Sequence, residues 1–201
     1  MPLSGTSKLE AINTMLSIIG ETPVNSTSGP VVASVKIADN ILTEVLREVQ
    51  GESWHFNTAK EVTLPLDSNG KIPLAASVAR VEVDRAYYPD KELVKRGDYL
   101  YDTRNQTDVF TAEIKHATVT YMLEFDELPE AAKRYVMIRA GRIFNDRMVG
   151  DQVKNGFTRI DESKARMDLR EYESKTANYS IFDNYSVARA IDRKTIWFNG
   201  R

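Results

Sequence analysis

Hydrophobic positions near the start of the chain recur at helical intervals. Leu9, Ile12, Leu16 and Ile19 follow one another at steps of three, four and three residues, which places them on one face of a helix. Ser7 and Glu10 have the spacing of a capping box, in which each side chain accepts a hydrogen bond from the backbone N–H of the other residue. Gly20 and Pro23 then stop the pattern. The sequence therefore predicts a capped helix that ends near Gly20.

A second amphipathic stretch lies before Gly51. Its apolar stripe consists of Ala38, Ile41, Leu42, Val45, Leu46 and Val49. This spacing is typical of a helix with one buried face, and the short join to the first helix predicts an antiparallel hairpin.

From residue 57 to residue 124 the pattern changes to a period of two. Short segments rich in β-branched and aromatic residues alternate with turn residues, and we predict strands within 61–64, 78–84, 93–102, 108–114 and 117–123. Arg96-Gly97-Asp98 is predicted to be a hairpin turn. The region is predicted to be a small antiparallel sheet.

Helical periodicity returns at Pro129. The next helix is apolar nearly all round and is expected to be buried on more than one side. We predict that Tyr135, Val136 and Ile138 form a core with Leu16, Ile41 and Val45. A fourth, highly charged helix is predicted at about 157–176, with a thin apolar contact made by Phe157, Ile160, Met167 and Leu169.

These elements predict an α+β fold. An antiparallel helical bundle is expected from 1–56 and 125–180, with a small antiparallel β-sheet domain, 57–124, inserted between the second and third helices. Residues 181–201 have no sustained period and are predicted to form an extended C-terminal tail, or docking arm.

Composition narrows the functional classes. The formal net charge is −2, so no global field attracts nucleic acid or an acidic membrane surface. Cysteine is absent, which excludes disulfides, thiolate nucleophiles and cysteine-based zinc sites. The N-terminus lacks the pattern of a signal peptide, and no apolar run has the length needed to cross a bilayer. We expect a soluble protein made in the cytosol.

An acidic cluster, Glu124, Asp126, Glu127 and Glu130, is the strongest candidate for catalysis. Two facing carboxylates could hydrolyse a glycan or peptidoglycan. Acidic residues are also favoured wherever a helix begins, and Pro129 suits a first helical turn. The helix start is the preferred interpretation, so we predict no enzyme, no catalytic residues and no cofactor.

Other candidate chemistry is weaker. His55 and His116 have no metal-ligand spacing, and no metal site is predicted. The third helix carries Lys133, Arg134, Arg139, Arg142 and Arg147, which leaves a free DNA-binding protein as a further alternative.

Four stretches resemble the tail tubular protein A family, the head-to-tail adaptors of short-tailed bacteriophages. They are LEAINTMLSIIGETPVNS, GESWHFNTAKEVTL, RGDYLYDTRNQTDVF and FDELPEAAKRYVMIRAGRIFNDRMVG. The resemblance implies a structural virion protein at the head–tail junction, made in the cytoplasm of the host bacterium. It also implies a twelve-subunit ring that contacts the portal protein, the tail nozzle (tail tubular protein B) and the tail fibres. Genomic DNA would pass through the lumen without sequence-specific binding, and no membrane would be involved.

The C-terminal tail carries a candidate interface. Its aromatic residues and arginines are Phe182, Tyr185, Arg189, Arg193, Trp197 and Phe198. Aromatic anchors beside arginines are typical of protein interfaces. We predict that the tail docks on a neighbouring subunit or on the portal. The alternative is that the tail folds back over its own bundle.

Overall fold

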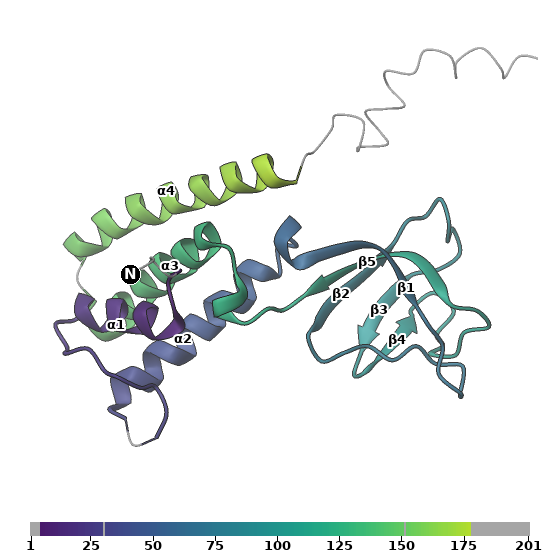
Figure 1. Cartoon of the computed structure of the whole chain (residues 1–201), viewed down its shortest axis with the longest axis horizontal. Coiled ribbons are helices and arrows are strands. Elements are labelled where there is room, and N and C mark those ends of the chain that lie inside the picture. The colour runs from purple at the N-terminus through teal and green to yellow at the C-terminus, as the bar shows by residue number, and fades with distance from the viewer. Residues whose placement is uncertain (1–4, 30, 151, 178–201) are drawn as a thin grey trace, which may run out of the picture.

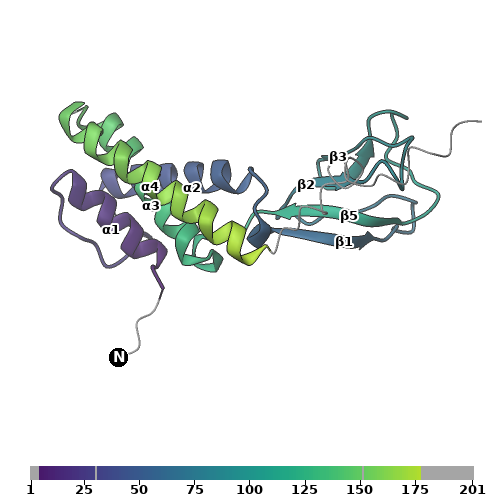
Figure 2. The same ribbon diagram turned by 90° about the horizontal axis from the view of Figure 1, so that it is seen from above.

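The helices and the strands occupy opposite ends of an elongated molecule in the computed structural model, which describes residues 5–29, 31–150 and 152–177. Figures 1 and 2 show the helices at one end and the sheets at the other. The strands lie between the second and third helices in sequence. The α+β class with a β insertion is therefore confirmed.

Four α-helices form the bundle: α1 (Lys8–Ile18), α2 (Ala33–Gln50), α3 (Glu130–Met148) and α4 (Gln152–Thr176). The Ser7–Glu10 capping box at the start of α1 is confirmed, since the Ser7 N–H donates to Glu10 Oε2 at 2.7 Å and the Glu10 N–H donates to Ser7 Oγ at 3.2 Å. After α1, Gly20 has a φ of +80°, a conformation that costs glycine little. Sequence-local chemistry therefore sets where this helix begins and ends.

The core of the bundle lies where α3 meets the other three helices. Tyr135, Val136 and Phe144 of α3 are buried with the apolar faces of α1 and α2. Ile138 is only half-buried at the edge of this core, so its predicted place in the interior is wrong. A Cβ at Gly141 would lie 2.9 Å from Ile18 Cδ1, which shows how closely α1 and α3 approach.

In the described residues, five strands form two antiparallel sheets, where a single small sheet was predicted. They are β1 (Thr58–Leu64), β2 (Val78–Val83), β3 (Leu93–Arg96), β4 (Tyr99–Asp102) and β5 (Ile114–Tyr121). One sheet has the order β1-β5-β2, and the other is the β3-β4 hairpin. The predicted turn at Arg96-Gly97-Asp98 is confirmed, because Arg96 pairs with Tyr99 and Gly97 has a φ of +61°.

The prediction of a strand at 108–114 is wrong, since only Ile114 of this segment belongs to a strand. Phe110 is buried in a second apolar cluster, and its N–H donates to the carbonyl of Gly70 at 2.7 Å. Gly70 has a φ of +73° and lies in the turn after Asp67. Packing against this turn holds the segment in an irregular conformation.

Two buried polar side chains join the helices to the strands. Gln50, at the end of α2, accepts a bond from the Leu123 N–H at 2.7 Å and donates to the Leu123 carbonyl at 3.0 Å. Asn57 donates through Nδ2 to the Gln50 carbonyl at 2.9 Å and to the Tyr121 carbonyl at 2.8 Å. The chain that enters the β region and the chain that leaves it are thereby bonded to each other at the junction.

Candidate functional site

Helix α4 lies along α3 and has little apolar contact of its own (Figures 1 and 2). Ala165 and Leu169 are its buried apolar residues among those whose side chains are described. Ile160 and Met167, which we predicted to make the contact, are 69% and 61% exposed. The buried Leu169 confirms part of the predicted contact, whereas Ile160 and Met167 lie on the outward face of the helix and the side chain of Phe157 lies outside the described residues.

Ion pairs supply much of the remaining contact between α3 and α4, together with a hydrogen bond from Arg166 to the Tyr135 hydroxyl at 3.4 Å. Glu162 of α4 accepts from Arg139 Nη1 at 2.7 Å and from Arg142 Nε at 2.5 Å. Arg139 also donates to both carboxylate oxygens of Glu48 on α2, and Arg142 donates to Asp146 at 3.1 Å. These groups form a charged seam, here defined as Glu48, Arg139, Arg142, Asp146 and Glu162. The seam connects α2, α3 and α4.

The protonation equilibria in the seam follow from these contacts. Burial acts to raise the pKa of Glu162, but hydrogen bonds from Arg142 and Arg139 outweigh it and hold the pKa below its ordinary value. Burial acts to lower the pKa of Arg139, and its bonds to Glu48 and Glu162 raise the pKa above the ordinary value. Glu162 of α4 and Arg139 of α3 therefore stay charged at neutral pH where these two helices meet.

The basic residues of α3 were the basis of the DNA-binding alternative. Arg139 and Arg142 are held in the seam, and Arg147 pairs with Glu44 on α2 at 3.0 Å. Lys133 is buried, which leaves Arg134 as the exposed basic residue of this group without an ion pair to another described residue. The arginines face carboxylates of the same chain, so α3 presents no basic stripe for a nucleic-acid backbone.

The acidic cluster at 124–130 surrounds two helix starts. Asp126 Oδ1 accepts from the Lys8 N–H at 2.9 Å, and Glu130 Oε2 accepts from the Thr6 N–H at 3.1 Å. Glu124 and Glu127 form a reciprocal capping box around the short 3-10 helix Phe125–Glu127, with 3.0 Å between the Glu124 nitrogen and Glu127 Oε2. Each carboxylate thus satisfies backbone N–H groups that would otherwise lack partners. The predicted helix start near Pro129 therefore accounts for only part of the cluster, because Asp126 and Glu130 bond backbone groups at the start of α1.

Both histidines contact other residues of the same chain. The ring of His116 stacks on Tyr87 at a centroid distance of 4.5 Å, and its Nδ1 contacts Glu61. The backbone N–H of His55 donates to Glu173 Oε1 at 2.5 Å, which fixes the later part of α4. Across the described ranges, no group of three or more His, Cys, Asp or Glu residues could hold a metal ion.

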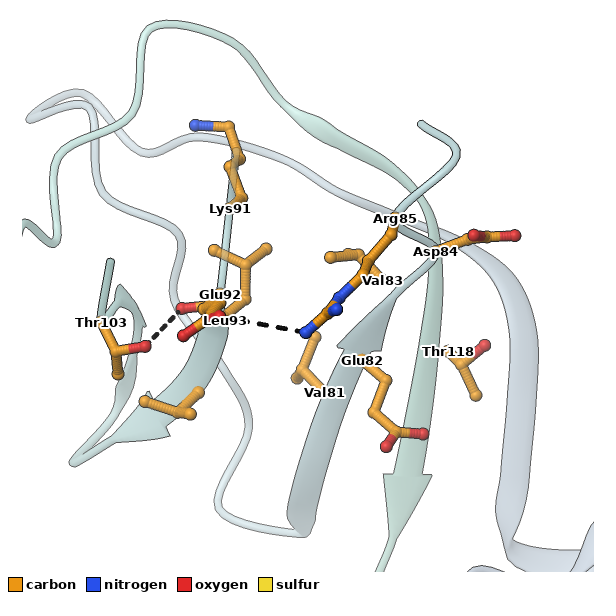
Figure 3. A pocket seen from close by; sticks show the side chains of 11 residues that line it. Val81, Glu82, Val83, Asp84, Arg85, Lys91, Glu92, Leu93, Thr103 and Thr118 are labelled. Atoms are coloured by element: carbon orange, nitrogen blue, oxygen red, sulfur yellow. Dashed lines mark hydrogen bonds and ion pairs between the residues drawn. The ribbon is translucent and has the colours of Figure 1, made fainter. Parts of the chain in front are cut away.

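A hollow of about 510 Å³ lies between β2 and β3. Figure 3 shows Arg85 extending toward Glu92, and these side chains pair at 4.0 Å. Thr103 Oγ1 donates to the Glu92 carbonyl at 3.0 Å, and Val81 and Leu93 contribute apolar walls. The hollow offers polar and apolar contacts but no nucleophile beside a base.

Comparison with known proteins decides the family. The family model described as tail tubular protein matches residues 9–179. The chain belongs to the tail tubular protein family. No curated protein matches it.

Membership of the tail tubular family makes the chain a structural protein of a bacteriophage tail, located in the virion. The family is structural and not enzymatic, so the hydrolase alternative for the acidic cluster is set aside. No helix in the described part of the chain is long and apolar enough to cross a membrane. The functional surfaces to consider are therefore those that contact other tail proteins.

The interface residues predicted from sequence all lie in 182–198, outside the described residues. Sequence reasoning missed the outward face of α4, where Ile160 and Met167 are exposed and Arg159 and Asp161 are exposed on either side of Ile160. A signal was present, since the pattern Arg–apolar–Asp occurs twice at an interval of seven residues.

Proposed function

We propose that this tail tubular protein is the adaptor that joins the portal to the tail nozzle of a short-tailed phage. In this proposal twelve copies form a ring, DNA leaves the capsid through the lumen, and tail fibres attach near the junction with the nozzle protein, tail tubular protein B. The proposal rests on family membership together with the resemblance of four sequence stretches to the adaptor branch of the family.

The exposed face of α4 is the observation that carries the proposal. Helix α4 already packs on α3 through its inward face, yet Ile160 is 69% exposed and Met167 is 61% exposed. Large apolar residues on one outward helical face are typical of a surface that another protein covers. A ring provides such a cover for every copy, because each subunit has a neighbour on both sides.

The charge distribution also supports a conduit. The formal net charge is −2, and Arg139, Arg142 and Arg147 are occupied by carboxylates of the same chain. Contacts between phosphates and cations add salt-dependent affinity, which would slow the passage of DNA. A channel subunit with internally paired arginines would bind the moving genome weakly and without sequence preference.

The C-terminal tail is proposed to dock on a neighbouring subunit or on the portal. Its anchors would be Trp197 and Phe198, with Phe182, Tyr185, Arg189 and Arg193 as further contacts. Aromatic side chains bury a large area at low entropic cost, and arginine adds directed hydrogen bonds.

Electron microscopy tests the proposed ring directly. Negatively stained images of the purified chain, alone and mixed with its portal protein, are expected to show rings, and the mixture is expected to show rings attached to portals. Rotational averaging gives the number of copies. If both samples contain only monomers or disordered aggregates of the chain, the proposal is contradicted.

A further inference from the structure

Helix α4 carries the same triplet twice, first Arg159-Ile160-Asp161 and then Arg166-Met167-Asp168. Seven residues make almost two helical turns, so the triplets have the same orientation and lie about 10.5 Å apart along the axis. Within each triplet, Arg and Asp differ by about 200° around the helix. The arginines therefore lie on one edge of α4, the aspartates lie on the opposite edge, and the apolar residues lie between them.

The packing of α4 leaves the first triplet toward solvent, whereas Arg166 and Asp168 of the second triplet are half-buried. Ala165 and Leu169 point inward, and Ile160 is at the centre of the outward face. Arg159 and Asp161 are exposed, and neither makes an ion pair with another described residue. The first triplet thus presents a positive charge on one edge and a negative charge on the other, both unpaired among the described residues, whereas Arg166 in the second triplet is already paired with Glu52.

The positive edge is hollowed. A depression of about 470 Å³ is lined by Arg142, Arg159, Glu162, Ser163 and Arg166. Two of its guanidinium groups are held by carboxylates of the same chain: Arg142 binds Glu162, and Arg166 binds Glu52 at 3.0 Å. The guanidinium of Arg159 has no such partner among the described residues. Because Arg142 and Arg166 are already paired, Arg159 is the cation of the hollow that is left for a carboxylate from outside the subunit.

We propose that the aspartate edge of one copy's α4 docks on the arginine edge of the next copy's α4. Asp161 of one subunit would then face Arg159 of its neighbour, and Asp168 would face Arg166 two turns along. The inference rests on the proposed ring, and it names the surface through which the ring closes. The contact joins two different surfaces of the same chain, which is the kind of interface that generates closed rings.

The charge pattern also selects the relative direction of the two helices. When the helices run parallel, opposite charges meet in both triplets. If one helix is turned end for end, its aspartate edge faces the aspartate edge of its neighbour, and like charges repel. All α4 helices therefore point the same way along the ring axis.

A charge exchange tests the docking. Arg159→Asp and Asp161→Arg are supplied from plasmids, singly and together, to cells infected with a phage that lacks this gene, and infectious particles are counted. Each single variant is expected to lower the yield by about 100-fold or more, because like charges at an interface cost several kcal/mol. Supplying both variants together is expected to restore the yield to within about 10-fold of wild type, since alternating copies place opposite charges at every contact.

The controls separate docking from folding. Arg134→Asp reverses an exposed arginine of α3 outside the hollow and is expected to complement like wild type. Thermal melts of the purified single variants are expected to match wild type, because the altered groups make no ion pair with other described residues of their own chain. Normal complementation by both single variants would overturn the inference. So would failure of the two variants together when their melts are unchanged.

The same variants distinguish this inference from the proposed ring. If negatively stained wild-type protein forms no ring, the proposed function fails. If rings of wild type form and rings of Arg159→Asp form equally well, the ring stands and the docking of the two α4 edges fails.

Discussion

Replacing Glu162 by glutamine keeps the size of the side chain but removes the charge that Arg139 and Arg142 share. The side chains of Glu162, Arg139 and Arg142 are 13%, 21% and 18% exposed, respectively, so all three are substantially withdrawn from water. Exposed ion pairs contribute about 0–1 kcal/mol, whereas removing one partner of a buried pair costs about 3–5 kcal/mol. The Glu162 contacts fall between these limits, and Glu162→Gln is expected to lower the free energy of unfolding by about 2 kcal/mol.

Urea denaturation followed by circular dichroism measures this change at neutral pH. The matched control is Glu171→Gln on the same helix, because Glu171 pairs with Lys175 where the two side chains are 63% and 70% exposed. The control is expected to leave the midpoint unchanged. An effect of Glu162→Gln no larger than that of Glu171→Gln would refute the assignment of the seam as the main attachment of α4.

The pH dependence gives an independent test of the same contact. The folded state holds the pKa of Glu162 below its ordinary value of 4.5. The stabilisation is therefore fully present above that value, and it is lost as pH falls through the lower folded pKa. The stability difference between wild type and Glu162→Gln should be constant near neutrality and shrink in acid. A difference that does not change with pH would show that the cost comes from packing rather than charge.

Three further predictions concern the helix contacts and the tail. Gly141→Ala is expected to change the free energy of unfolding by less than about 1 kcal/mol, because the terminal methyl of the half-buried Ile18 can move away from the added Cβ and alanine has the better helix propensity; urea denaturation measures this, and a loss of more than about 2 kcal/mol would contradict it. Ile138→Ala should cost about 1–2 kcal/mol and Phe144→Ala about 3–5 kcal/mol in urea denaturation, since Phe144 is fully buried and Ile138 is not; equal costs would contradict this ranking. Truncation after Asn184 is expected to leave the melting temperature of the free subunit unchanged and to abolish portal binding in a pull-down assay; an early melt or full binding would assign the tail to the folded domain.

The first three helices were predictable because their signals are local. The Ser7–Glu10 capping box and the apolar stripe through Leu42 and Val45 depend on residues within a few turns. The arrangement of the acidic cluster was only half predictable. Its role at a helix start follows from Pro129, but the bond from the Lys8 N–H to Asp126 joins residues 118 positions apart.

The orientation of α4 could not be read from its apolar residues. Hydrophobic patterning selected Phe157, Ile160, Met167 and Leu169 as the contact. Of these, Leu169 does lie on the inward face, beside Glu162 and Ala165, whereas Ile160 and Met167 are exposed. A glutamate can face inward here because arginines of α3 meet it, and periodicity within α4 carries no information about them. The irregular segment at 108–114 was mispredicted for a similar reason, since the Gly70 turn that holds Phe110 is distant in sequence.

The bonded junction at Gln50 and Asn57 has a mechanical consequence. The β region is attached to the bundle by two chain segments, and hydrogen bonds from these side chains fasten the segments to each other. A force applied to the strands is therefore carried by α2 and α3 together. The two connecting segments do not separate one after the other, because the hydrogen bonds between them transmit the force to both. Bending at the junction would also break buried polar contacts, each of which is costly to leave unmade.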